Sequence, residues 1–274
     1  MLVAKFVVRL MMDPLKEITL LDFERVARRI EVFIRRRVSE AEASGVVLGL
    51  SGGLDSSTAA YLAVRALGKG SVLGLLLPDS RVTPPADVED AKAVADALGI
   101  ETIYIDISSI HRAYMEYLKP HRLAEGNLRA RIRMCILYYY ANLMNRLVLG
   151  TGDRSEVLIG YFTKYGDGGV DIQPLAGLYK TQVRALAAYL GVPERIVAKR
   201  SSPRLWAGQM AEDELGLSYE DIDRILYSVF DRKMVVEEVS RSLGLPLDKV
   251  LFVLNRCRAT KHKRRPPPAP TPQT

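Results

Sequence analysis

The stretch Leu50-Ser51-Gly52-Gly53-Leu54-Asp55-Ser56-Ser57 decides how this chain of 274 residues is interpreted. It follows residues 45–50, a short apolar run typical of a strand that is buried on both faces of a parallel sheet. Gly52 and Gly53 carry no Cβ, so the backbone can turn sharply and bring its N–H groups close to phosphate oxygens. Asp55 would repel bare phosphate, but its carboxylate could hold a Mg²⁺ ion that bridges phosphates. The stretch therefore predicts a loop that binds nucleotide phosphates together with a metal ion.

Apolar runs and helical spacings alternate on both sides of this loop. The runs predict strands at residues 45–50, 72–77, 102–107 and 147–150, with a short further strand at 170–173. The spacings predict helices at residues 18–39, 56–67, 84–98, 109–118, 128–144, 179–190, 219–230, 235–243 and 247–257, with Thr83 as the N-cap of the third. This alternation predicts an α/β fold, a doubly wound and mostly parallel sheet with flanking helices.

Composition narrows the class of protein. Hydrophobic residues make up 48% of the chain, and the net charge is +7 with a pI of about 9.3. A basic protein of this kind can bind nucleic acid, a membrane surface or polyanionic small molecules. Part of the excess lies in residues 261–265, and basic runs are weak evidence for nucleic acid. We therefore expect polyanionic small molecules as ligands, and neither a nucleic acid nor a membrane partner.

The two cysteines and the first residues indicate a cytoplasmic protein. Cys135 and Cys257 form no Cys-x-x-Cys pair, which suits a reducing compartment, and we expect Cys135 to be a small buried apolar residue. The apolar run at residues 6–12 is too short for a membrane span and lacks a cleavage pattern. Met11 and Met12 are alternative start sites. We expect an N-terminal extension at 1–20, a single domain at 21–260, and a basic, then Pro-rich tail at 261–274.

Two other nucleotide motifs are excluded. No Gly-x-x-x-x-Gly-Lys-Ser/Thr occurs, and the glycines of residues 68–74 are wrongly spaced for a dinucleotide fingerprint and precede a strand. A Gly-Gly turn alone would be a plain strand–helix joint with Asp and Ser as caps. The complete Ser-Gly-Gly-x-Asp-Ser string after a strand is more specific, and it resembles the PP-loop of the ATP pyrophosphatase superfamily. That resemblance implies an adenine-nucleotide α-hydrolase-like fold that cleaves ATP between the α and β phosphates.

A second set of motifs lies in the following part of the chain. Residues 150–156 come after the fourth expected strand, at the sheet edge where open α/β sheets bind ligands. Residues 162–169 then read Phe-Thr-Lys-Tyr-Gly-Asp-Gly-Gly. This combination is similar to the signature of NAD synthetases, and further matches occur at residues 126–127, 129–134, 215–216 and 262–264. The resemblance spans about residues 20–267. Because no amidase domain precedes it, the chain resembles the short, ammonia-using type.

The resemblance implies a role for each matching residue. ATP would be bound by Gly49, Leu50, Ser51, Gly52, Gly53, Leu54, Asp55, Ser56, Thr151, Lys180 and Ser202. Deamido-NAD would be bound by Arg131, Lys164, Asp171, His262 and Lys263. Mg²⁺ would be held by Asp55 and Glu156, and Asp55 and Lys180 would be the catalytic residues. NAD synthetases are homodimers with substrate sites near the interface, so the resemblance also implies a homodimer.

Plainer roles compete with some of these assignments. Without the resemblance, Lys180 would be a solvated helix-face lysine, and His262 and Lys263 would belong to an unstructured basic tail. His111 and His121 match no motif, and we expect them to be surface or capping residues.

The implied reaction has two steps. The carboxylate of deamido-NAD attacks the α-phosphate of ATP to give an NAD-adenylate and pyrophosphate, and ammonia then displaces AMP. Two alternatives remain open, another PP-loop adenylating enzyme such as one that modifies tRNA, and a non-catalytic nucleotide-binding module. The chain departs from the family pattern at residues 201–203, Ser-Ser-Pro instead of Pro-Ser/Thr-Ala, and at Ala211, where relatives carry Asp. We expect the loop that contains these departures to close over the site.

Overall fold

A parallel sheet lies at the centre of the computed structural model, which describes residues 13–270. Its four strands are β1 (Val46–Gly49), β2 (Val72–Leu76), β3 (Glu101–Tyr104) and β4 (Leu147–Val148), in the order β3-β2-β1-β4. In register, Val46 of β1 pairs with Val72 on one side and Leu147 on the other. The strand order thus reverses at β1, and in open α/β sheets ligands bind outside the carboxyl ends of the strands at this point. The predicted doubly wound parallel sheet is confirmed.

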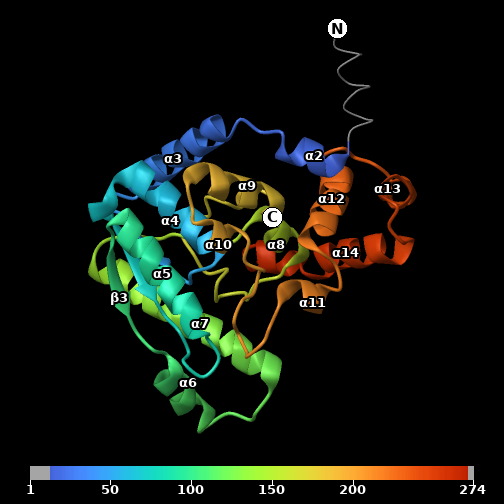
Figure 1. Cartoon of the computed structure of the whole chain (residues 1–274). Coiled ribbons are helices and arrows are strands. Elements are labelled where there is room, and N and C mark those ends of the chain that lie inside the picture. The colour runs from blue at the N-terminus through green and yellow to red at the C-terminus, as the bar shows by residue number, and fades with distance from the viewer. Residues whose placement is uncertain (1–12, 271–274) are drawn as a thin grey trace.

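Helices cover both faces of the sheet because successive residues of each strand point to opposite faces. Val46 and Leu48 pack in one apolar cluster, whereas Val47 packs in another. The first cluster lies under α3 (Phe23–Glu40), α4 (Leu54–Leu67), α5 (Pro85–Leu98) and α9 (Lys180–Leu190). The second cluster lies under α7 (Arg122–Leu143), which is flanked by α6 (Ser108–Met115). Figure 1 shows α6 projecting from the end of the molecule below α7.

A third apolar cluster joins the remaining helices beside the sheet. They are α2 (Pro14–Thr19), α8 (Arg154–Ile159), α11 (Ala211–Leu215), α12 (Tyr219–Phe230), α13 (Val236–Leu243) and α14 (Leu247–Ala259). Figure 1 shows α12, α13 and α14 grouped on the side opposite α5 and β3. The short elements η1 (Lys69–Ser71), α10 (Glu194–Val197) and η2 (Lys261–Arg264) complete the described chain. The cluster matters for the site because α8 carries Glu156.

Several sequence-based boundaries are wrong. The helix predicted at 18–39 is two helices, because the Asp22 side chain accepts a hydrogen bond from the Arg25 N–H and starts a new one. Thr83 does not cap α5; its hydroxyl accepts from the Asp79 N–H instead. Only the bridge between Leu149 and Ile172 forms where a strand was predicted at 170–173. Helix α7 begins six residues before the predicted start.

Two burial predictions are also wrong, and one of the histidines caps a helix as expected. Cys135 is exposed, because it lies on the outer face of α7. His111 is buried rather than on the surface, with its ring beside the Arg81 guanidinium. His121 caps α7 by accepting from the Ala124 N–H. The apolar run at 6–12, with the start sites Met11 and Met12, lies outside the described residues.

Within residues 13–270, none of the helices combines the length and the apolar character that crossing a membrane requires.

Candidate active site

The predicted phosphate loop joins β1 to α4 and leaves the start of that helix open. Gly52 has φ +69°, and a Cβ there would lie 2.2 Å from the Asp87 carbonyl oxygen, so this close approach requires glycine. The Ser56 hydroxyl accepts from the Ser51 N–H at 3.2 Å and holds the loop against the helix. The Ser57 N–H donates to the Gly53 carbonyl, and it is the first N–H along α4 that makes such a bond to the preceding turn. The earlier N–H groups therefore form an anion site at the helix N-terminus.

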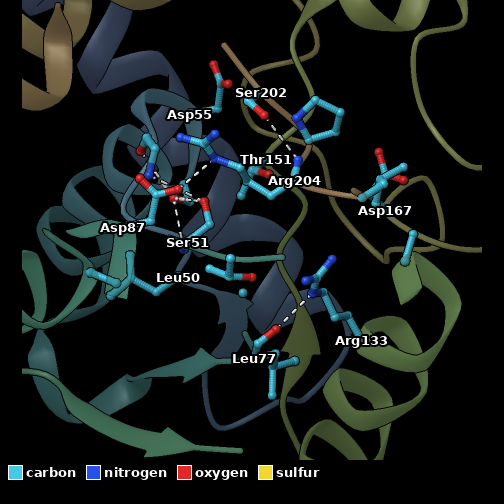
Figure 2. Close-up of a pocket in the computed structure, with 18 of the residues that line it drawn as sticks. Leu50, Ser51, Asp55, Leu77, Asp87, Arg133, Thr151, Asp167, Ser202 and Arg204 are labelled. Atoms are coloured by element: carbon cyan, nitrogen blue, oxygen red, sulfur yellow. Dashed lines mark hydrogen bonds and ion pairs between the residues drawn. The ribbon is translucent and has the colours of Figure 1, made fainter. Parts of the chain in front are cut away.

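A cavity of about 280 Å³ opens over this loop. Ten of the predicted ATP and metal residues line it: Gly49, Leu50, Ser51, Gly53, Leu54, Asp55, Ser56, Thr151, Glu156 and Ser202. Leu75, Leu76 and Leu77 add an apolar wall at the end of β2, and Arg133 lines the side formed by α7 (Figure 2). The cavity thus joins an anion site to an apolar surface, as a nucleotide with a flat base and a charged tail requires.

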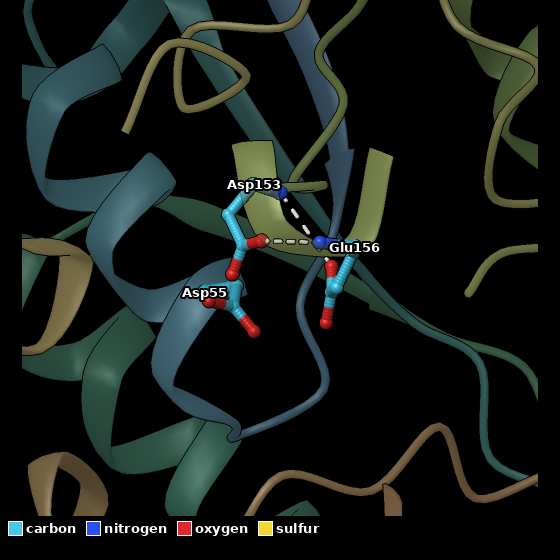
Figure 3. A group of neighbouring side chains, drawn as sticks. All are labelled: Asp55, Asp153 and Glu156. Atoms are coloured by element: carbon cyan, nitrogen blue, oxygen red, sulfur yellow. Dashed lines mark hydrogen bonds between the residues drawn. The ribbon is translucent and has the colours of Figure 1, made fainter. Parts of the chain in front are cut away.

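Three carboxylates meet beside the loop. One oxygen each from Asp55, Asp153 and Glu156 lies within 4.8 Å of the others, and Figure 3 shows Asp55 of α4 facing the start of α8. The Lys180 ammonium lies 2.7 Å from Asp55, 2.8 Å from Asp153 and 2.8 Å from Glu156. Lys180 is fully buried, which excludes the plainer interpretation of a solvated helix-face lysine.

Charge and burial oppose each other in this cluster. Burial disfavours the charge on Lys180, but its three carboxylate neighbours outweigh burial and raise the pKa of the ammonium well above its usual value. Burial raises the pKa of the Glu156 carboxyl well above its usual value, and Asp153 and Asp55 add to the shift while Lys180 opposes it. One ammonium cannot balance three carboxylates. The cluster therefore has a deficit of positive charge.

Sequence reasoning missed two residues that hold this cluster in place. Asp153 accepts from the Glu156 N–H at 2.8 Å, and Glu156 faces the Asp153 N–H, so the pair forms a capping box at the start of α8. Asp-x-x-Glu is a known helix-start pattern and could have been recognised. Buried Asp223 of α12 accepts from the Ser155 hydroxyl and from the N–H and hydroxyl of Thr181. Asp223 thereby fixes the starts of α8 and α9, and no local sequence pattern marks it.

The residues predicted to bind deamido-NAD lie outside the cavity. Asp171 is exposed, and its carboxylate accepts from the Tyr138 hydroxyl at 2.9 Å and from the Val148 N–H at 2.7 Å. Arg131 is exposed on α7 and donates to the Lys164 carbonyl at 3.3 Å. These three residues thus lie on or near the surface, close to α7, and not beside the phosphate loop.

The predicted tail residues are ordered in η2. Lys263 donates to the carbonyls of Gly160 and Phe162, at 2.8 and 2.7 Å, and burial lowers the pKa of its ammonium. His262 beside it is exposed. Arg264 donates to the Val157 and Leu158 carbonyls in the last turn of α8. Residues 261–264 are therefore not an unstructured tail, and they tie α8 to the turn after it.

The segment at 199–210 covers one side of the cavity. Lys199 and Arg204 both donate to the carboxylate of Asp87 in α5, at 2.9 and 2.7 Å. Ser202 lines the cavity, and its hydroxyl donates to the Gln209 carbonyl. Pro203 stands between Ser202 and Arg204, and Ala211 adds a methyl group to the cavity wall. The segment that departs from the family pattern thus lines the cavity, and two of its side chains pair with a carboxylate of α5.

Comparisons with known proteins identify the family. A model described as NAD synthase matches residues 26–267. This chain belongs to the NAD synthase family. A relative from Hyperthermus butylicus, named NH(3)-dependent NAD(+) synthetase, is 57% identical over 94% of each chain. Another with that name, from Aeropyrum pernix, is 52% identical over 93% of this chain and 92% of its own.

Two solved structures share the fold along nearly the whole chain. An NMN synthetase from Francisella tularensis superposes with a TM-score of 0.79, at 36% identity over 91% of this chain and 99% of its own. An NH3-dependent NAD synthetase from Campylobacter jejuni, in complex with nitrate, has a TM-score of 0.78, at 33% identity over 92% and 100%. The chain is therefore an α/β ligase of the NAD synthase family, which forms carbon–nitrogen bonds. The family supports neither alternative, a tRNA-modifying enzyme or a non-catalytic module.

Proposed function

We propose that this enzyme converts deamido-NAD to NAD, using ATP and ammonia, through an NAD-adenylate. One observation carries the proposal: the phosphate loop shares one cavity with Asp55 and Glu156 of the carboxylate cluster, at the carboxyl end of a parallel sheet, in a chain of this family. The relatives named NH(3)-dependent NAD(+) synthetase support both the substrate and the nitrogen source.

Atoms balance in two steps. An oxygen of the substrate carboxylate attacks the α-phosphorus of ATP, the bond from that phosphorus to the bridging oxygen breaks, and pyrophosphate leaves. Ammonia then adds to the acyl carbon, loses a proton, and AMP leaves with the former carboxylate oxygen. The open N–H groups of α4 would stabilise the negative charge that moves onto pyrophosphate. Lys180, which is bound to all three carboxylates, would hold Asp55 and Glu156 in place. The cavity holds the two reactants together, which removes most of the entropy cost of their meeting.

The residues present fit a Mg²⁺ ion. Asp55 and Glu156 would hold it, with Asp153 beside them, and these are the oxygen ligands that Mg²⁺ prefers. Asp55 Oδ1 is buried and accepts no hydrogen bond from any residue in 13–270, so it can serve as a ligand atom. The charge deficit left by Lys180 also favours a second cation. When bound, Mg²⁺ would neutralise polyphosphate charge during the departure of pyrophosphate.

The central test is release of pyrophosphate from ATP and ammonium, with and without deamido-NAD. Release that depends on deamido-NAD, with NAD as product, is expected. The same assay with glutamine in ammonia-free buffer should give no NAD, because we expect ammonia to be the nitrogen source. Pyrophosphate release that ignores deamido-NAD would refute the proposed substrate, and NAD formation from glutamine would refute the proposed nitrogen source.

A second substrate follows from a specific observation. The similar structure from Francisella tularensis is an NMN synthetase, and none of the five residues predicted for deamido-NAD lines the cavity of this chain. The deamidated form of NMN carries the same carboxylate without the adenylate half. Comparing kcat/KM for the two substrates decides between them, and we expect deamido-NAD to be preferred.

We also propose that the enzyme is a homodimer that pairs through α7. Arg131, Cys135, Tyr139 and Leu143 are exposed at intervals of four residues, so they form one stripe along the helix. Tyr139 is 64% and Leu143 66% exposed, which is a large apolar surface for one helix face. The stripe continues to Arg131, so a partner packed there would lie beside the predicted deamido-NAD residues. Tyr139→Glu with Leu143→Glu should give monomers in sedimentation velocity, and dimers that survive would refute this interface.

A further inference from the structure

Segment 199–204 brings three cations to the cavity, and they differ in how many donors are already used. They are Lys199, Arg200 and Arg204. Lys199 donates all three of its ammonium N–H groups, to the Gly52 carbonyl at 2.9 Å, to Asp87 at 2.9 Å and to Asp90 at 2.6 Å. Arg200 is directed to Asp213 on the outer surface, at 2.6 Å. Lys199 cannot receive a new anion without giving up an existing partner, and the Arg200 side chain is 54% exposed and pairs outside the cavity.

Arg204 differs because its side chain is largely buried at the cavity and leaves most of its donors unused. Its Nε donates to Asp87 Oδ2 at 2.7 Å, and this bond fixes the plane of the guanidinium. Within residues 13–270 its two terminal nitrogens, which carry four N–H groups, donate to nothing. The side chain lines the cavity and is only 20% exposed, and Figure 2 shows it extended across the cavity toward Asp87. A fixed guanidinium with free donors is suited to bind a phosphate with two parallel hydrogen bonds.

The backbone at Arg204 adopts an uncommon conformation. Its φ is +51°, in the left-handed region that glycine adopts easily and other residues adopt at a cost. Such residues cluster at ligand sites, where the side chain compensates for the strain. Pro203 precedes it and fixes its own φ, so the turn presents Arg204 in one direction.

The contacts of Asp87 place this guanidinium at the phosphate end of the cavity. Asp87 binds both Arg204 and Lys199, and Lys199 in turn binds the carbonyl of Gly52 in the phosphate loop. Of the two other arginines that line the cavity, Arg200 pairs with Asp213 on the outer surface, and Arg133 donates to the carbonyl of Leu77 in the apolar part. Arg204 is therefore the arginine that is connected to the loop.

We propose that Arg204 binds the β and γ phosphates of ATP and retains contact with the pyrophosphate that forms from them. The inference rests on the proposed function in one respect, that ATP occupies this cavity. In this assignment Arg204 supplies a planar pair of donors and the start of α4 supplies its N–H groups, so both bind the leaving group. This adds Arg204 to Ser202 as an ATP-binding residue of the segment in which the chain departs from the family pattern.

The test is calorimetric binding of ATP, AMP and pyrophosphate, each with Mg²⁺, to wild type, Arg204→Gln, Arg204→Gly and the control Arg195→Gln. Arg195 also donates its Nε to a carboxylate of α5, Asp90, at 2.7 Å, but it does not line the cavity. Losing a charged hydrogen bond to phosphate should raise the Kd for ATP and pyrophosphate about ten- to a hundredfold in both Arg204 variants. The Kd for AMP should stay within about threefold, and Arg195→Gln should match wild type with all three ligands.

Thermal unfolding separates binding from structure. Glycine relieves the strained φ, so Arg204→Gly should unfold at a temperature no lower than that of Arg204→Gln. Unchanged affinity for pyrophosphate in both variants, or a loss confined to AMP, would overturn the assignment of Arg204 to the β and γ phosphates. Failure of the wild type to bind ATP would instead overturn the proposed function.

Discussion

The candidate site has two halves, the predicted ATP residues and the predicted deamido-NAD residues. A single chain brings the first set together in one cavity but not the second. Ten predicted ATP and metal residues line a single cavity, because a strand, a loop and a helix start bring them together. The five predicted deamido-NAD residues lie outside it, and Asp171 and Lys263 already bind protein groups. The ATP half is thus preformed. The deamido-NAD half requires either an exchange of hydrogen bonds or a second copy of the chain, and this difference makes the two halves separable by mutation.

The largest effect is expected in the ATP half. Asp55→Ala removes a carboxylate from the cluster that holds Lys180 and would hold Mg²⁺. Charge on the departing pyrophosphate would lose part of its compensation, so kcat should fall by at least about a hundredfold. Steady-state NAD formation at saturating Mg²⁺ measures this. Glu89→Ala is the control, because Glu89 is an exposed carboxylate of α5 whose one ion pair within residues 13–270 is with Lys92. Equal turnover in the Asp55 variant and the control would show that this carboxylate has no catalytic role.

A smaller and selective effect is expected in the deamido-NAD half. Asp171→Ala should raise the apparent KM for deamido-NAD about ten- to a hundredfold, the cost of one charged hydrogen bond, and leave that for ATP within about threefold. Tyr138→Phe is the matched variant, because it frees one oxygen of Asp171 and keeps the carboxylate. Its KM for deamido-NAD should not rise. Saturation curves for each substrate measure both KM values. A shift of the ATP curve alone would mean that Asp171 belongs to the ATP half and not to the deamido-NAD half.

The smallest effect concerns α6, which packs against α7 and lies outside both halves of the site. His111 is buried beside Arg81 and Arg129, and burial, helped by these two cations, lowers the pKa of its imidazole. A lowered pKa in the folded state means that the stabilisation is complete above about pH 6.5 and is lost as the pH falls below that value. The loss should reach at most about 1.4 kcal/mol per pH unit. His111→Asn should therefore show a weaker decrease in Tm between pH 7.5 and pH 5.5 than wild type. Parallel curves would show that His111 does not titrate with folding.

Features that depend on residues close together in the sequence could be predicted. Alternating apolar runs, a Gly-Gly turn and a following helix determined the sheet, the loop and most of the ATP half, because neighbouring residues meet at one sheet edge. The resemblance added Lys180 and Glu156, which the structure places together with Asp55. Their assignment to ATP and to metal stays a prediction.

Contacts between residues far apart in the chain could not be predicted from the sequence. Asp223 reaches Thr181 across 42 residues, and no periodicity or motif indicates that contact. The burial of His111 depends on Arg81 and Asp79, which come from a different loop. The exposure of Cys135 likewise reflects which face of α7 the sheet covers. Such facts depend on tertiary packing, which the spacing of residues along one helix does not fix.

The bonds from Arg264 to α8 have a consequence for the order in which the enzyme is built. Its guanidinium satisfies the carbonyls of Val157 and Leu158, yet 107 residues of chain separate Val157 from Arg264. A ribosome makes the chain from its amino end, so all of α9 to α14 must be made before Arg264 can bind the last turn of α8. A nascent chain can therefore carry a finished phosphate loop and an unfinished carboxylate cluster. Translation that stops shortly before residue 264 would leave the helix that bears Glu156 without the guanidinium that binds its last turn.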